Sequence, residues 1–214
     1  MTTAVAASVV PRSRRSFWIR QITLWHWVSS GVCLGAMLLF TLTGITLNHA
    51  GAISGEAIIT KREAELPERI HRSVREEKLT GKLPLPPGAL AWIDAQYGER
   101  PAPDAAEWSE EEVYVSLPKP GGDAWLTIDR ASGAVKYERT DRGWISYFND
   151  LHKGRHTGFA WFVFIDVVAA ACLVFTVSGL VLLQVHAAKR PSTWPIILAG
   201  LATPLVLMLF FVHV

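Results

Sequence analysis

Three long apolar runs constrain this chain more than any other feature of its sequence. They extend from Trp25 to Leu47, from Phe159 to Val185 and from Trp194 to Val212. A helix rises about 1.5 Å per residue, so each run is long enough to cross a hydrocarbon core of about 30 Å. Hydrophobic residues make up 50% of the 214 positions, more than a soluble domain of this size needs for one core. The sequence therefore predicts a membrane protein with three transmembrane helices.

Basic residues predict how these helices are oriented. Four arginines precede the first run, at positions 12, 14, 15 and 20, and Lys189 and Arg190 lie in the short loop between the second and third runs. Positive charge of this kind marks the cytoplasmic side of a membrane. We therefore expect the N-terminus inside, with the central segment and the C-terminus outside. A cleaved signal peptide is the alternative at the N-terminus, but the first apolar run is longer than the core of such a signal.

The segment between the first two runs has the composition of a separate external domain. Of the 19 acidic residues, 18 lie between Glu56 and Asp150. After a polar stretch with helical character around Pro67, LPLPPGALAWIDAQYG predicts a helix that starts at proline. EEVYVSLP, DAWLTIDR and GAVKYERT predict antiparallel strands joined by turns. The expected fold class is membrane α-helical, with a small α+β domain inserted between helices 1 and 2.

These patterns divide the chain into six expected segments. We expect a cytoplasmic tail at 1–24, membrane helices at 25–50, 156–187 and 194–214, the external domain at 51–155, and a cytoplasmic loop at 188–193. Both cysteines lie inside apolar runs and no C-x-x-C-H is present, which excludes covalent c-type haem attachment. The sequence has no nucleotide-binding, hydrolase or clustered zinc motif. It has no basic nucleic-acid face, and we identify no internal repeat.

Six of the seven histidines lie at or near the ends of the apolar runs. The inner ones are His26 and His186, and the outer ones are His49, His152, His156 and His213. Only His71 lies well inside the external segment. Each of the first two membrane helices therefore carries histidine to both faces of the membrane.

Pairs of neutral imidazoles from neighbouring helices are typical of haem b ligation. The inner pair is His26 with His186. The outer pair is His49 with His156 or His152, which lie one helical turn apart, and His213 is a third outer candidate. The pattern predicts one or two haem b groups per chain, with the iron bound by these imidazoles. Any one of the histidines, taken alone, is better explained as an amphipathic side chain that reaches headgroup water, and only the pairing favours haem.

Two other residues stand out near the membrane. Asp166 lies inside the second apolar run, where an ionisable side chain is costly and usually faces a bundle interior or water. It can accept a proton, hold a metal or hydrogen-bond another helix. Arg155 lies beside the outer histidines and can pair with a haem propionate, although cations that flank membrane helices are common.

Several short motifs together resemble those of PepSY-associated transmembrane proteins. They are HW at His26, TG at Thr43 and LN at Leu47, then IDRASGAV, which resembles the end of a PepSY module, and LHKGRHTG before the second run. The resemblance implies a PepSY-like periplasmic domain and a bacterial inner-membrane location, and it supports the histidines at positions 26, 49, 152, 156 and 186 as functional. Larger relatives include haem-containing reductases of ferric siderophores and have more membrane helices than this chain.

The residues and the resemblance together predict a small b-type cytochrome. Its electrons would come from a cytoplasmic donor or the quinone pool and pass to a periplasmic acceptor such as a ferric siderophore or another ferric chelate. The corresponding enzyme class is a membrane oxidoreductase of the ferric-chelate reductase type, with no catalytic residue assigned. The alternative is a haem-free membrane anchor that presents a PepSY module for regulation or assembly. Membrane lipid and other copies of the chain are further expected partners, and nucleic acid is not.

Overall fold

The computed structural model describes residues 14–53, 55–77 and 80–212, which form two compact units. The helical unit comprises the described parts of 1–38 and 165–214, and the sheet unit comprises those of 39–164. Helices α1 (Arg14–Asn48) and α6 (Gly158–His186) each contribute to both units. His213 and the N-terminal tail up to residue 13 lie outside the described residues.

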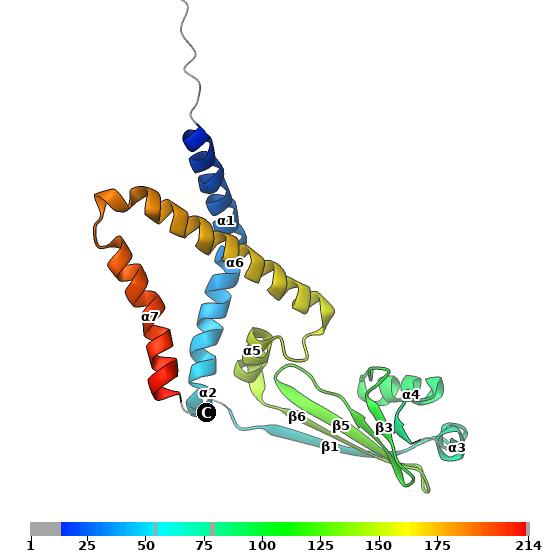
Figure 1. The fold of residues 1–214 in the computed structure, drawn as a ribbon. Helices are drawn as coiled ribbons and strands as arrows, with labels where there is room; N and C mark the ends of the chain where they lie inside the picture. Colours follow the sequence, from blue (N-terminus) through cyan, green and yellow to red (C-terminus); the bar gives the residue numbers. More distant parts are fainter. Residues whose placement is uncertain (1–13, 54, 78–79, 213–214) are drawn as a thin grey trace, which may run out of the picture. The chain divides into compact units, whose positions relative to one another are not determined.

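Three helices are long and apolar enough to cross a membrane: α1, α6 with the short η1 (Ala187–Lys189) that follows it, and α7 (Thr193–Phe211). They are drawn in blue to cyan, yellow to orange and red in Figure 1. Most of their large apolar side chains are exposed, as expected for helices that contact lipid. Helix α1 has 35 residues and begins at Arg14, so the basic residues Arg15 and Arg20 belong to the helix itself.

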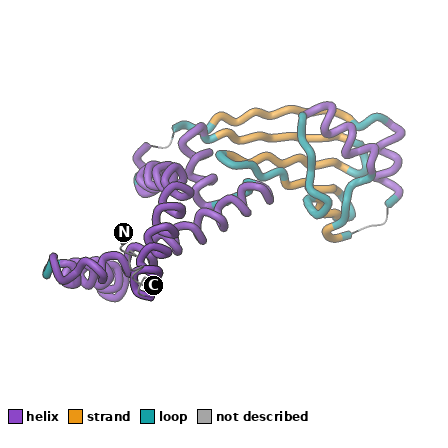
Figure 2. The backbone as a smooth tube through the Cα atoms, turned by 90° about the horizontal axis from the view of Figure 1, so that it is seen from above, coloured by secondary structure: helices purple, strands orange, loops and turns teal. Residues whose placement is uncertain are grey.

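The sheet unit contains six antiparallel strands, shown side by side in Figure 2. They are β1 (Ile58–Glu65), β2 (Gly81–Lys82), β3 (Ala106–Trp108), β4 (Glu112–Ser116), β5 (Gly122–Asp129) and β6 (Ala134–Asp141), in the spatial order β1-β6-β5-β4-β3-β2. Burial alternates along β5, where Ala124, Leu126 and Ile128 are buried. Such alternation means that one face of the sheet is packed against a core.

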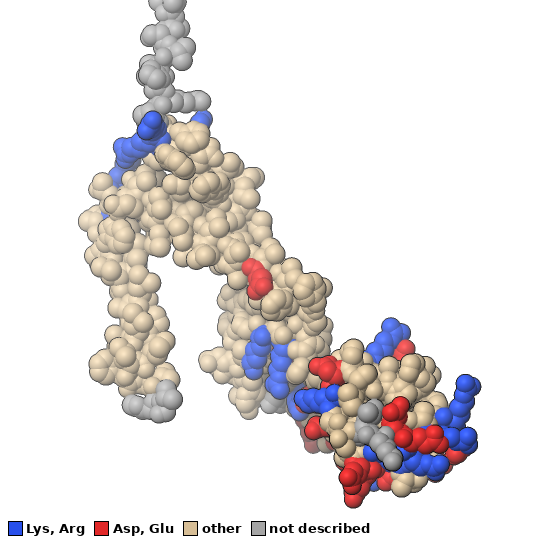
Figure 3. Space-filling model, turned by 45° about the vertical axis from the view of Figure 1, so that its right-hand side comes forward, with Lys and Arg blue, Asp and Glu red and all other residues tan. Residues whose placement is uncertain are grey.

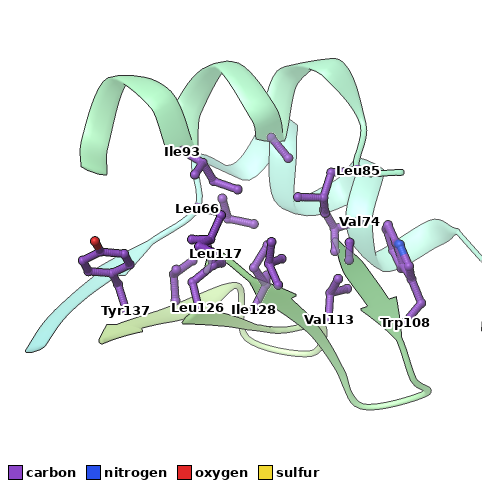
Figure 4. Close-up of a cluster of buried hydrophobic side chains, with 14 of the residues drawn as sticks. Leu66, Val74, Leu85, Ile93, Trp108, Val113, Leu117, Leu126, Ile128 and Tyr137 are labelled. Carbon is purple, nitrogen blue, oxygen red and sulfur yellow. The ribbon is translucent and has the colours of Figure 1, made fainter. Parts of the chain in front are cut away.

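Helices α3 (Glu68–Glu76) and α4 (Pro87–Tyr97) provide the other side of that core. Ile93 of α4 points toward the side chains of Leu126 and Leu117 in Figure 4, and Val74 of α3 belongs to the same buried cluster. Pro86 and Pro87 start α4, where a missing backbone N–H has no cost. Charged side chains gather over this unit, as Figure 3 shows.

The sequence predicted part of this fold correctly. The helix that starts at Pro87 and the strands β4, β5 and β6 are confirmed. The sequence predicted helical stretches around Pro67, and α3 confirms the part after that proline. The part before it is wrong, because Ile58–Glu65 forms β1 and pairs along its whole length with β6. Cross-strand pairing outweighs the helix propensity of the charged residues here. Helix α5 (Gly143–Lys153) and the short α2 (Ala50–Ile53) were not predicted.

A buried polar cluster lies beside the core. The carboxylate of Glu99, only 2% exposed, accepts a hydrogen bond from the Tyr137 hydroxyl at 2.9 Å and forms an ion pair with Lys119 Nζ at 2.7 Å. Burial, followed by the hydrogen bond to Glu99 and that residue's charge, raises the pKa of Tyr137 to about 12. The ring of Tyr137 also stacks on Tyr97, with centroids 4.5 Å apart.

The raised pKa of Tyr137 predicts a specific alkaline instability. The unfolded chain loses this proton near pH 10 and the folded chain only near pH 12, so stability is full below pH 10 and falls as the pH rises through this window. Two pKa units correspond to roughly 2–3 kcal/mol. Tyr137→Phe should remove this part of the decline, measured by denaturant unfolding of the detergent-solubilised chain from pH 8 to 11.5. An identical decline in both proteins would contradict the assignment.

Two isoleucines offer a matched test of the core. Ile93→Ala removes a fully buried side chain and should lower the free energy of unfolding by about 2–5 kcal/mol. Ile59→Ala removes the same atoms from an exposed position on the edge strand β1 and should change it by less than about 1 kcal/mol. Chemical unfolding monitored by circular dichroism measures both. Equal losses would mean that α4 does not cover the sheet.

Candidate functional site

An apolar cavity of about 690 Å³ lies in the helical unit. His26 of α1 and His186 of α6, the two inner histidines that the sequence singled out, both line it. The apolar part of the wall is Phe175, Leu180, Leu182 and Leu183. Lys189, Arg190 and Thr193 complete the lining and supply its positive charge.

The imidazole of His26 is held by residues of α6. Its ring stacks on Phe175 with centroids 4.6 Å apart and an angle of 15° between the planes. Nδ1 lies 3.1 Å from the Phe175 carbonyl oxygen and 3.1 Å from Ser178 Oγ. A Cβ on Gly179 would lie 3.2 Å from His26 Cε1, so the ring occupies space that a side chain would restrict.

These contacts determine which ring nitrogen of His26 carries the proton. A carbonyl oxygen only accepts, and the Ser178 hydroxyl is 2.6 Å from the Val174 carbonyl, to which it donates. Both contacts therefore require a proton on Nδ1 of the neutral ring. Nε2 then has a free lone pair, which is the form of histidine that binds a metal.

His186 has the same arrangement at its Nδ1. That atom lies 2.8 Å from the Leu182 carbonyl oxygen one turn earlier in α6, so it also donates. The side chain is exposed, and among the described residues Nε2 of His186 has no hydrogen-bond partner. The cavity is thus lined by two imidazoles whose Nε2 atoms are both available.

In the sheet unit, His152 of α5 packs against the last turns of α1. Nδ1 of His152 lies 2.7 Å from Thr43 Oγ1, and the hydroxyl of Thr43 donates to the Leu39 carbonyl at 2.9 Å. The rings of Phe40 and His152 meet edge to face at 5.2 Å. A Cβ on Gly44 would lie 3.5 Å from His152 Cε1. When the Thr43 hydroxyl donates to the Leu39 carbonyl, its oxygen accepts a hydrogen bond from Nδ1 of His152 and Nε2 is left free.

Contacts in the middle and C-terminal half of α5 position His152. Asp150 accepts a hydrogen bond from the Gly121 backbone N–H at 2.8 Å, and Thr46 donates to buried Asn149 at 2.8 Å. Gly121 has φ of +77°, and a Cβ there would lie 2.8 Å from Tyr147 Cα. Only glycine combines that conformation with so close an approach. The β4–β5 turn and α1 therefore clamp α5 from two directions.

The other outer histidines lie elsewhere in the sheet unit. His49 is exposed, and its Nδ1 bonds the Ile45 carbonyl of its own helix at 3.0 Å. His156 is exposed in the turn after α5 with φ of +57°, and it lines a cavity of about 430 Å³ with Glu99, Arg100 and Lys119. No contact between His49 and either His152 or His156 occurs among the described residues.

Asp166 and Arg155 have no role that their contacts identify. Asp166 is exposed on α6, and within the described part of the chain it makes no hydrogen bond or ion pair. Arg155 is exposed, and its backbone N–H caps α5 by donating to the Asp150 carbonyl. His71 is instead a core residue, with Nε2 donating to the Arg130 carbonyl at 3.0 Å.

Sequence reasoning missed the residues that hold the histidines. Residues 40–44 read FTLTG and residues 175–179 read FTVSG, so the expectation that the chain has no internal repeat is wrong at this short scale. The sequence offered a signal, since Phe-Thr-x-(Ser/Thr)-Gly recurs in two apolar runs. Within the described residues, no cluster of three or more His, Cys, Asp or Glu side chains suits a bare metal ion.

Comparison with known proteins gives a family but no characterised relative. The model of the PepSY_TM-like family matches residues 17–213, nearly the whole chain. No curated protein and no solved structure matches the chain.

A side chain at Gly179 tests whether the His26 ring lies against this position. Gly179→Val should push the imidazole away from α6 and lower the free energy of unfolding by about 1–3 kcal/mol, because overpacking strains a tight contact. Gly35→Val makes the same change where a Cβ meets nothing within 4 Å, and it should be nearly neutral. Thermal unfolding in detergent compares them. Equal effects would show that Gly179 does not face His26.

Proposed function

Because the chain belongs to the PepSY_TM-like family, we propose that it is a b-type cytochrome of the bacterial inner membrane. In this proposal His26 and His186 bind a haem in the cavity of the helical unit. The observation that carries the proposal is that both imidazoles line one apolar cavity with Nδ1 occupied by an oxygen acceptor and Nε2 free.

The donor set fits haem better than a bare ion. A protein site for zinc or another bare ion needs three or four side-chain ligands, and none is found in the described residues. A haem brings four ring nitrogens of its own, so two imidazoles complete its coordination. A volume of about 690 Å³ lies within the range of about 300–1,000 Å³ typical of cofactor sites.

The remaining lining supports the same cofactor. Phe175 and the leucines of α6 offer an apolar surface to a porphyrin face and keep water from it. Lys189 and Arg190 offer cations for two propionates, and charge-assisted hydrogen bonds of this kind are strong. A bound haem would supply one-electron chemistry through its ferric and ferrous states. The protein's part is to hold the ligands, exclude water and set the basicity of each imidazole through its Nδ1 partner.

We propose a second haem on the periplasmic side, with His152 and either His49 or His156 as candidate ligands. The donor is a quinone or a cytoplasmic reductant, and the acceptor is a periplasmic ferric chelate such as a ferric siderophore. This direction rests on the basic residues at the start of α1 and at Lys189 and Arg190, which favour a cytoplasmic location.

A reduced-minus-oxidised absorption spectrum of the detergent-purified chain tests the proposal most directly. A b-type difference spectrum, with haem quantified against protein, would support it. Two haems per chain would support both sites, and one would support a single site. A colourless protein after expression with added haem would contradict it and favour the haem-free anchor that presents a PepSY module to a partner.

Substitution of the inner histidines should remove the haem of the helical unit. His26→Ala and His186→Ala should each lower haem content by one equivalent per chain, because one imidazole cannot complete axial ligation. His71→Gln changes a histidine of the domain core and should leave the haem content unchanged. Pyridine haemochrome quantitation of the folded variants measures all three. Full haem content in both alanine variants would exclude this cavity as the site.

A further inference from the structure

One short sequence element holds a histidine in each of the two units. Residues 175–179 hold His26, and residues 40–44 hold His152. We infer that the two copies act alike and that their hydroxyl residues, Ser178 and Thr43, are positioning residues that keep the proton on Nδ1 and present Nε2. This inference rests on the proposed function where it assigns His152, in place of His49 or His156, as the outer counterpart of His26.

Each position of the element makes the same kind of contact in both copies. The phenylalanine ring lies against the imidazole, stacked at 4.6 Å for Phe175 and edge to face at 5.2 Å for Phe40. The glycine leaves room for Cε1, which a Cβ would approach to 3.2 Å at Gly179 and 3.5 Å at Gly44. An aromatic contact and a missing side chain therefore place both rings against a helix surface.

The hydroxyl is oriented by its own helix in both copies. Ser178 donates to the carbonyls of Val174 and Phe175, at 2.6 and 3.0 Å. Thr43 donates to the equivalent carbonyls of Leu39 and Phe40, at 2.9 and 3.3 Å. A hydroxyl has one proton, so once that proton is directed to the helix the oxygen is left as an acceptor. In that orientation its partner is a protonated Nδ1.

This arrangement separates His152 from the other outer histidines. The Nδ1 of His49 bonds a carbonyl of its own helix, so no other element holds its ring. His156 lies in a turn and makes no hydrogen bond through its ring among the described residues. Of the outer histidines whose surroundings are described, His152 alone has a side-chain acceptor from a second helix. Among these outer histidines, the ring of His152 is therefore the one whose Nδ1 contact matches that of His26.

The two copies of the element differ in the number of acceptors at Nδ1 of the histidine. His26 has a second acceptor at Nδ1, the Phe175 carbonyl oxygen at 3.1 Å. Thr43 Oγ1 is the only hydrogen-bond partner of the His152 ring within the described residues. Loss of the Thr43 hydroxyl should therefore affect His152 strongly, whereas loss of the Ser178 hydroxyl should affect His26 weakly.

The first experiment does not require haem. The full chain, labelled with ¹⁵N-histidine and purified without haem in detergent at pH 8, reports the tautomer of each imidazole through its nitrogen shifts. Signals are assigned by their loss in His26→Gln and His152→Gln. We expect the Nδ1–H tautomer at His26 and His152 in the unsubstituted chain. In Thr43→Val, His152 should be a mixture of the Nδ1–H and Nε2–H tautomers, and Thr43→Ser should restore the Nδ1–H tautomer. Ser178→Ala should leave His26 in the Nδ1–H form because Phe175 still accepts.

His49 is an internal control in the same spectra. Its acceptor is a backbone carbonyl, which no side-chain substitution removes, so its tautomer should be unchanged in every variant. A Nε2–H tautomer at His152 in the unsubstituted chain would overturn the inference. So would a Thr43→Val spectrum in which His152 keeps its Nδ1–H form.

The second experiment uses haem titration and separates this inference from the proposed function. Partners of a ligating histidine typically change metal affinity by about 10- to 100-fold. Thr43→Val should weaken the binding of the outer haem by that factor, and Thr43→Ser should restore it. His49→Ala and His156→Ala should each retain His152-dependent binding through the remaining partner. Loss of the outer haem in His156→Ala but not in His152→Ala would overturn the assignment of His152. Absence of all haem binding, with the expected tautomers, would contradict the proposed function and leave the role of the Thr43 hydroxyl supported.

Discussion

The hydrogen bonds from the His26 imidazole to Ser178 and to the Phe175 carbonyl oxygen link α1 to α6 in the helical unit. Lipid is as apolar as the leucines and valines of these helices, so burial of such side chains contributes little to their association. A polar group in that setting has no water to bond and must find a protein partner. The imidazole of His26 bonds α6 at Phe175 and Ser178, and this fixes how α1 is aligned along α6. The cavity beside it, with His186 in its lining, depends on that alignment.

In the sheet unit, polar contacts hold the short helix α5 against the last turns of α1. The core of the unit is an ordinary packed layer, with α3 and α4 on one face of an antiparallel sheet. The β4–β5 turn reaches from this layer to α5, where Gly121 allows close contact with the backbone of Tyr147. The backbone N–H of Gly121 donates a hydrogen bond to the carboxylate of Asp150. Asn149 then bonds Thr46 of α1. The position of His152 is thus determined by a chain of polar contacts and one close glycine approach.

Prediction from the sequence succeeded where a pattern repeats locally. Alternating residues such as Val113, Val115, Leu126 and Ile128 identified two strands, and Pro87 identified the start of a helix. It failed for β1, whose charged residues suit a helix equally well. The strand form of β1 depends on pairing with β6, from Glu65 with Ala134 to Ile58 with Asp141, 69 to 83 residues further along the chain. Helix α5 was also missed, because it starts at glycine and lacks a capping side chain, so the sequence carries no start signal for it.

The sequence by itself determined the three apolar helices, the family, and the histidines that deserve testing, because hydropathy and residue type are local properties. It indicated that His26 and His186 belong together but gave no way to choose among the outer histidines. Only the tertiary structure decided which imidazoles have a partner from another helix, because a hydrogen bond such as that of His152 to Thr43 joins residues 109 positions apart. Tautomer and orientation are properties of such contacts, and spacing along one helix does not encode them.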